Sequence, residues 1–226
     1  MADLLGKALR DYKAGDLEAF LLVHTSYGEI DTMPAAVFFR NYEQMPDLEK
    51  YALSICRGRV LDAGAGAGSH SLELQKRGLY VVALDISPEA VQIMKERNIE
   101  QAITGDIFNF RQGKFDTILL LMNGIGIARD MQEIKHLLKH LKSLLLPGGQ
   151  ILLDSCDVDY LSEVNIFQNY VGEVTYQFEY KGEKSEPFGW LYLDASTLKK
   201  VAKVSGWQCQ IIYEEGESYL ARLVTK

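Results

Sequence analysis

The sequence predicts an α/β domain built on a doubly wound, mostly parallel sheet. Between Arg59 and Asp154, short apolar runs typical of buried strands alternate with stretches in helical period. A glycine-rich turn separates the first of these runs from the helix that follows it. Repeated strand–helix alternation requires crossover connections, and therefore a parallel sheet with helices on both faces. The 226 residues suffice for one such domain with an elaboration.

Residues 1–58 are expected to form a helical N-terminal cap on this domain, which spans 59–226. The cap has no glycine-rich motif and contains large side chains such as Phe20, Tyr27 and Phe39. We interpret it as a cover for the sheet rather than as an independent domain.

The domain begins with a strand at 60–63, followed by the glycine turn and a helix. A second strand spans 80–85, after which Ser87 can cap a helix with Pro88 at its first position. Further strands are expected near 101–104, at 115–122 and at 151–154. Before the strand at 151–154, Ile and Leu residues at helical spacing predict a helix that ends at Pro147.

From about residue 173 the pattern changes from strand–helix alternation to paired strands. Two strand-like runs separated by a polar turn predict an inserted β-hairpin at about 173–193. A helix at 194–205 and strands near 208–213 and 218–224 complete the sheet.

Composition narrows the functional classes. The chain is 47% hydrophobic and 24% charged, close to the average of soluble globular proteins. Its net charge of −7 and its lack of a basic cluster argue against a nucleic-acid partner. The longest strongly apolar run, 118–122, is too short to cross a membrane, and the N-terminus has no signal-peptide core. We expect a cytoplasmic protein.

Neither metal nor disulfide is predicted. Cys56, Cys156 and Cys209 are widely spaced, which indicates reduced thiols. His136 and His140 can share a helix face, but no third ligand accompanies them. A solvated helix is the better interpretation.

The glycine turn indicates a ligand. Its spacing is G-x-G-x-G from Gly64, and the third glycine of the dinucleotide fingerprint would fall at Ser69. Asp62 directly precedes the turn, Asp85 ends the second strand and Asp106 follows the third. An acidic edge disfavours a pyrophosphate and suits the net cationic S-adenosylmethionine, although an NAD-dependent oxidoreductase stays an alternative.

From Val60 to Val224 the chain resembles a class I S-adenosylmethionine-dependent methyltransferase. The resemblance rests, in order, on VLDAGAGAGS, VVALDISPEA, TGDI, FDTILLLMNGIG and LLLPGGQILLDS. It implies a seven-stranded sheet with the last strand antiparallel and the cofactor across the strand ends. After Asn123 the chain lacks the Pro-Pro-aromatic stretch of nitrogen methyltransferases acting on DNA bases or glutamine, which argues against those substrates.

The resemblance also implies roles for the residues at the strand ends. Those expected to bind the cofactor are Asp62, Gly64, Ala65 and Gly66 at its methionine part, Asp85 at the ribose, Ile86, Asp106 and Ile107 at the adenine, and Asn123 beneath the sulfonium.

We therefore expect methyl transfer from S-adenosylmethionine to a small-molecule acceptor. The alternatives are a protein or RNA acceptor, or a non-catalytic S-adenosylmethionine-binding protein. Candidate catalytic residues are His70, Asn123 and Asp154, and a general base is needed only if the acceptor must lose a proton. The cap and the hairpin, with Phe188 and Trp190, are expected to enclose the acceptor. The sequence leaves the oligomeric state open.

Overall fold

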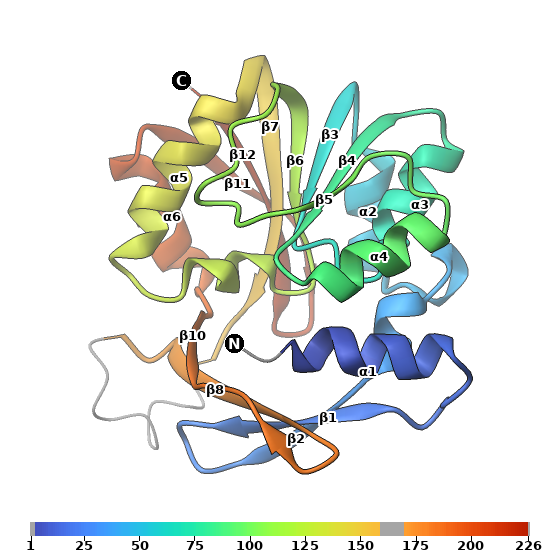
Figure 1. The fold of residues 1–226 in the computed structure, drawn as a ribbon. Coiled ribbons are helices and arrows are strands. Elements are labelled where there is room, and N and C mark those ends of the chain that lie inside the picture. Colours follow the sequence, from blue (N-terminus) through green and yellow to red (C-terminus); the bar gives the residue numbers. More distant parts are fainter. Residues whose placement is uncertain (1–2, 159–169, 226) are drawn as a thin grey trace.

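The computed structural model describes residues 3–158 and 170–225 and contains two sheets (Figure 1). The larger is seven-stranded, in the order β11-β12-β7-β6-β3-β4-β5. Its strands are β3 (Arg59–Ala63), β4 (Tyr80–Asp85), β5 (Ala102–Thr104), β6 (Phe115–Leu120), β7 (Leu145–Cys156), β11 (Trp207–Glu215) and β12 (Ser218–Thr225). The strands from β7 to β5 pair in parallel, and β12 is antiparallel to β7 and β11. This confirms the predicted fold class.

Helices cover both faces of the large sheet (Figure 1). On one face lie α2 (Asp47–Ser54), α3 (Ser69–Lys76) and α4 (Pro88–Glu96), and on the other α5 (Glu133–Leu144) and α6 (Ala195–Val204). Val60 and Leu119 belong to the core beneath α2 and α3, whereas Leu61 and Ile118 belong to the core beneath α5 and α6. Central strands buried on both faces read as continuous apolar runs, which is why the sequence located them.

The predicted N-cap of helix α4 forms as expected. Ser87 Oγ accepts a hydrogen bond from the Ala90 amide at 3.0 Å, and Pro88 occupies the first helical turn. This N-cap fixes where β4 ends and α4 begins. The carboxyl end of β4 is therefore defined by local sequence.

The N-terminal segment is helical only in part. Alongside α1 (Leu4–Lys13), η1 (Ala35–Phe39), η2 (Tyr42–Gln44) and α2, it contains β1 (Phe20–Thr25) and β2 (Ile30–Pro34), which we did not expect. The two strands pair with each other, and β1 also pairs with β8 (Glu173–Tyr180), placing Val23 opposite Phe178. The local sequence does not specify these strands, and the pairing of β1 with the distant strand β8 stabilises them.

The predicted hairpin is β8 with β9 (Glu183–Lys184) and β10 (Phe188–Leu191). Together with β1 and β2 it forms a second sheet, five-stranded and antiparallel. In Figure 1 this sheet lies below the large sheet, with α1 between it and α4. Apolar residues of α1, β1, β8 and α4 form one buried cluster that includes Leu9, Leu21, Tyr180 and Ile93.

The second sheet is joined to the end of β6 by η3 (Gly124–Ala128), which contacts β10. Because η3 follows the carboxyl end of β6, this contact places the second sheet at the edge where the predicted site residues lie. Within the described residues, no helix combines the length and the apolarity that crossing a membrane requires.

Candidate functional site

The glycine turn after β3 adopts backbone conformations that favour glycine. Gly64, Gly66 and Gly68 have φ angles of +79°, +56° and +81°. The amides of Gly64 and Ala65 both donate to the Leu84 carbonyl, at 2.8 and 3.0 Å, which holds the turn beside the end of β4. The sequence pattern therefore produces a tight backbone at the strand ends.

Asp85 ties this turn to the start of α4. Its carboxylate is 7% exposed and accepts from the Gly66 and Ser87 amides, each at 2.8 Å. Burial raises the pKa of Asp85, and the two amide hydrogen bonds act in the opposite direction. Each carboxylate oxygen has two lone pairs, so Asp85 can accept further hydrogen bonds from a ligand.

Asp62 lies beneath the turn and is 2% exposed. It accepts a hydrogen bond from Ser71 Oγ at 2.7 Å, which joins the end of β3 to α3. Burial raises the pKa of Asp62, and the charge of His70 opposes that change. Asp62 is thus a buried carboxyl group whose hydrogen bond with Ser71 holds the turn.

The residues expected at the adenine occupy different environments. Ile86, directly after Asp85, is 68% exposed. Asp106 is half-buried and accepts from the Phe108 amide at 2.9 Å, an ordinary turn contact. The side chain of Ile107 is buried in the core beneath α5. Of these three, Ile86 presents the most open apolar surface.

Asn123 follows β6 in a strained conformation. Its φ is +53°, and that of the preceding Met122 is +61°, a region that favours glycine. Ser155 Oγ donates to Asn123 Oδ1 at 2.9 Å, and Asn123 Nδ2 donates to the Leu191 carbonyl at 3.5 Å. Strain of this kind concentrates at functional sites, where surrounding contacts maintain it.

Asp154 lies beside Asn123, on the neighbouring strand β7. Its carboxylate accepts a long hydrogen bond from the Gly124 amide at 3.4 Å. Burial raises the pKa of Asp154 to about 6, against the smaller effect of the Asn123 and Gly124 amides. The structure therefore brings together two of the three candidate catalytic residues, and one of them ionises near neutral pH.

The third candidate, His70, is buried in an ion pair with Glu49, and the charges of both act on the pKa of Asp154. Its Nε2 lies 2.8 Å from Glu49, whose other oxygen accepts from Arg40 at 2.7 Å. Burial opposes charge on both His70 and Glu49, but their mutual hydrogen bond and attraction prevail. The pKa of His70 is raised and that of Glu49 is lowered. Sequence reasoning did not select Glu49, because a glutamate in an amphipathic helix carries no signal of burial.

The N-terminal cap contacts the glycine turn directly. A β-carbon placed on Gly66 would lie 2.8 Å from the Phe38 ring. Ser69 Oγ donates to the Phe38 carbonyl at 2.7 Å. The cap therefore lies over the turn.

The three cysteines are free thiols. Burial raises the pKa of Cys56 to about 12 and the pKa values of Cys156 and Cys209 to about 11, so the nucleophilic thiolate is disfavoured. Among the residues that the structure describes, no cluster of three or more His, Cys, Asp or Glu is placed to hold a metal ion.

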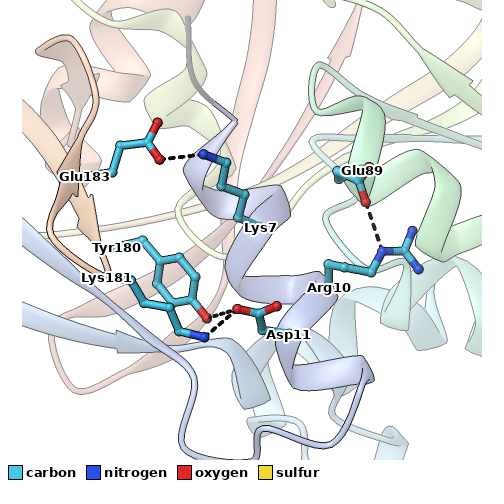
Figure 2. A pocket seen from close by; sticks show the side chains of 7 residues that line it. All are labelled: Lys7, Arg10, Asp11, Glu89, Tyr180, Lys181 and Glu183. Atoms are coloured by element: carbon cyan, nitrogen blue, oxygen red, sulfur yellow. Dashed lines mark hydrogen bonds and ion pairs between the residues drawn. The ribbon is translucent and has the colours of Figure 1, made fainter.

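A cavity of about 450 Å³ lies between α1, α4 and the β8–β9 turn (Figure 2). Its walls contain acidic and basic side chains that pair with one another. The pairs are Lys7 with Glu183 at 2.5 Å, Arg10 with Glu89 at 2.9 Å and Lys181 with Asp11 at 2.7 Å. These contacts join α1 to α4 and to the β8–β9 turn, and they leave the cavity wall electrically balanced.

Comparison with known proteins agrees with the geometry. The model of a methyltransferase-domain family matches residues 60–149. A SAM-dependent methyltransferase from Bacteroides fragilis, solved in complex with S-adenosyl-L-homocysteine, superposes with a TM-score of 0.91 at 38% identity. That alignment covers 99% of this chain and 94% of the other, and so includes both sheets.

Two curated relatives match over shorter stretches. Cypemycin N-terminal methyltransferase from a Streptomyces species is 30% identical over 102 residues, which are 43% of this chain and 42% of that protein. Magnesium-protoporphyrin O-methyltransferase from Rhodobacter capsulatus is 36% identical over 97 residues, which are 40% and 39% of the two chains. The match thus spans about two fifths of each curated relative. By its sheet order and its near full-length likeness to the Bacteroides protein, this chain belongs to the class I S-adenosylmethionine-dependent methyltransferases.

Proposed function

We propose that this protein transfers a methyl group from S-adenosylmethionine to a small organic acceptor. The observation that most directly supports the proposal is Asp85, a buried carboxylate at the end of β4 bonded to the amide of Gly66. Asp62 and Asp106 add carboxyl groups at the ends of the neighbouring strands. An acidic edge of this kind favours a net cationic ligand over a pyrophosphate.

The residues present fit this cofactor. Gly64 and Gly66 adopt conformations that favour glycine and form a tight turn at the strand ends, and Asp85 retains lone pairs for the two ribose hydroxyls. Ile86 offers an exposed apolar surface on which a flat base can pack. Asp106 would accept from the adenine amino group.

S-adenosylmethionine supplies a methyl group on a positively charged sulfur: a lone pair of the acceptor forms the new bond to carbon, and the carbon–sulfur electron pair stays on sulfur. What this chain adds is positioning and a proton acceptor. Asn123 and Asp154 lie at adjoining strand ends, where an acceptor can be held in line with the methyl group. Above about pH 6 ionised Asp154 can take a proton from an O–H or N–H acceptor.

A polypeptide acceptor is the second candidate. The name of the Streptomyces relative, an N-terminal methyltransferase, favours it. The name of the Rhodobacter relative, a magnesium-protoporphyrin O-methyltransferase, favours a small molecule. Aromatic side chains of the second sheet, beside η3, support the small acceptor because they can enclose it.

Two measurements test the proposal. Calorimetry should show binding of S-adenosylmethionine and S-adenosylhomocysteine and no binding of NAD. Incubation with methyl-labelled S-adenosylmethionine and separate metabolite, peptide and RNA fractions should then label the metabolite fraction. Binding of NAD in place of S-adenosylhomocysteine would overturn the cofactor, and label confined to peptides or RNA would overturn the acceptor class.

A further inference from the structure

The second sheet has an aromatic side. Along β8, side chains alternate between the two faces, so Tyr176 and Phe178 point one way and Glu179 the other. In β10, Phe188 lies directly opposite Tyr176, and Trp190 follows two residues later on the same side. We call Tyr176, Phe178, Phe188 and Trp190 the aromatic face.

The aromatic face adjoins the end of β6. A β-carbon on Gly126, in η3, would lie 2.2 Å from the Trp190 indole, so this ring rests directly on η3. The next residue, Leu191, accepts from Asn123 Nδ2 at 3.5 Å. The strand that bears two of the aromatic rings is therefore attached to a residue expected to face the acceptor.

Phe188 is the centre of the aromatic face. Its ring centroid lies 4.8 Å from that of Phe178 at 75°, 6.2 Å from that of Tyr176 at 80°, and 6.4 Å from that of Trp190 at 83°. All four rings are half-buried, whereas Leu191 beside them is fully buried. Edge-to-face packing leaves ring surface for stacking, and covering that surface with another flat apolar group is favourable.

The polar groups of the aromatic face are neutral. The Tyr176 and Tyr192 hydroxyls hydrogen-bond to each other at 2.6 Å, and burial raises the pKa of Tyr176, which keeps it protonated. The charge of β8 lies on the other side, where Glu179 pairs with His24 at 2.7 Å. One exposed carboxylate of β2, Asp31, is on the same side as Tyr176 and contributes to the rise in its pKa, which also disfavours an anionic ligand. Neutral rings with a hydroxyl edge favour an uncharged ligand over a carboxylate or phosphate, because a charge would lose its hydration there.

We propose that the aromatic face is the binding site of the methyl acceptor, and that the acceptor is an uncharged, planar aromatic compound bearing a hydroxyl or amino group. The inference rests on the proposed methyl-transfer function. The aromatic ring of the acceptor stacks against Phe188 and Trp190. Its hydroxyl or amino group is directed to the ends of β6 and β7, where Asn123 and Asp154 lie.

Matched pairs of small molecules test this inference by binding alone. Calorimetry on the complex with S-adenosylhomocysteine compares naphthol with decahydronaphthol, and catechol with cyclohexanediol. The protein variants are Phe188→Leu and Phe178→Leu on the aromatic face. The matched control is Phe20→Leu, a ring 46% exposed at the start of β1. Thermal melting and the affinity for S-adenosylhomocysteine are measured for each variant.

At least one planar probe should bind about tenfold more tightly than its saturated partner. Either leucine variant that melts like wild type should lose that preference, whereas Phe20→Leu should keep it. Equal binding of both planar probes and their saturated partners, or an unchanged preference in the folded leucine variants, overturns the aromatic acceptor site. Failure of S-adenosylhomocysteine to bind wild type would instead overturn the proposed function, so the two failures are distinguishable.

Discussion

We expect the Asp85 carboxylate to have two tasks. It accepts hydrogen bonds from the Gly66 and Ser87 amides, which organises the turn, and we propose that it also binds the ribose of the cofactor. Alanine would therefore remove a structural contact together with a binding contact. Asparagine is the milder replacement, because its carbonyl oxygen keeps one of the two amide hydrogen bonds, whereas its NH2 group faces the other amide as a second donor. The fold of the variant is therefore measured together with its affinity.

We expect Asp85→Asn to weaken S-adenosylhomocysteine binding at least about tenfold, since charge-assisted hydrogen bonds to the ribose would be lost. Calorimetry measures the affinity, and a thermal melt verifies the fold. Asp116→Asn is the matched control, because Asp116 accepts from the Arg59 amide at 2.8 Å at the amino-terminal end of β6. Wild-type affinity in a folded Asp85→Asn protein would contradict the assignment.

Asp154 is expected to reduce stability at neutral pH. Because burial raises its pKa from 3.8 to about 6, the folded state binds this proton more tightly than the unfolded state. The stabilisation that this bound proton gives the folded state is complete below about pH 4 and is lost as the pH rises through about 6. Asp154→Asn should therefore be about 3 kcal/mol more stable than wild type at pH 8 in denaturant titrations. Asp47→Asn, at an exposed helix start, should show no gain.

The same substitution should lower activity if the acceptor loses a proton during transfer. The wild-type rate is expected to rise with pH through about 6, as Asp154 ionises. In Asp154→Asn the rate should be low and lack this rise. A variant that is both more stable and fully active would show that Asp154 is not the proton acceptor.

At the scale of elements, a buried ion pair connects the cap to the glycine turn. Glu49 on α2 bonds both His70 on α3 and Arg40 after η1. The contribution of His70 is complete below about pH 6.5 and is lost above its raised pKa, and that of Glu49 is lost as the pH falls below about 4.5. The pair therefore stabilises the fold most strongly between these limits.

We expect Glu49→Ala to lower the free energy of unfolding by about 3–5 kcal/mol near neutral pH, because it leaves His70 buried without its partner. Denaturant titration against pH measures the loss, which should shrink as the pH rises and His70 becomes neutral. Glu43→Ala, on the exposed side of η2, is the control. Equal stability of the two variants would mean that the pair does not hold the cap.

At the scale of the whole molecule, the two ends of the chain depend on each other. Strand β1 completes the sheet that β8 and β10 begin, and α1 packs between that sheet and α4. If residues 1–58 only covered the large sheet, as the sequence indicated, deleting residues 1–44 would leave a folded domain with weakened cofactor affinity. The shared sheet changes this expectation, because deletion would expose the edge of β8 and the apolar surface of α4.

We therefore expect the chain lacking residues 1–44 to lose methyl transfer and to unfold or associate more readily than wild type. Size-exclusion chromatography and thermal melting measure the second effect, and transfer of labelled methyl to a metabolite fraction measures the first. A monomeric truncated chain with the full rate would show that neither β1 nor the cap contributes to the acceptor site.

The fold of the large sheet was predictable because its signals are local. Buried parallel strands such as β4 read as apolar runs, and Ser87 with Pro88 marks the start of α4 by its own chemistry. Once the strands are parallel, their carboxyl ends share one edge, which placed Gly64, Asp85 and Asn123 together. The sequence by itself determined this edge and its acidic character.

Tertiary contacts decided the rest. Residues 20–34 turn at Gly28 as a hairpin would, yet β1 also pairs with β8 at the other end of the chain. Likewise, burial of Glu49 follows from how α2 packs on α3, not from its neighbours in sequence. Periodicity and capping act over a few residues, whereas pairing of distant strands and burial of a charge depend on which surfaces meet after folding. For that reason only the three-dimensional structure joined the cap and the hairpin into one sheet beside the site.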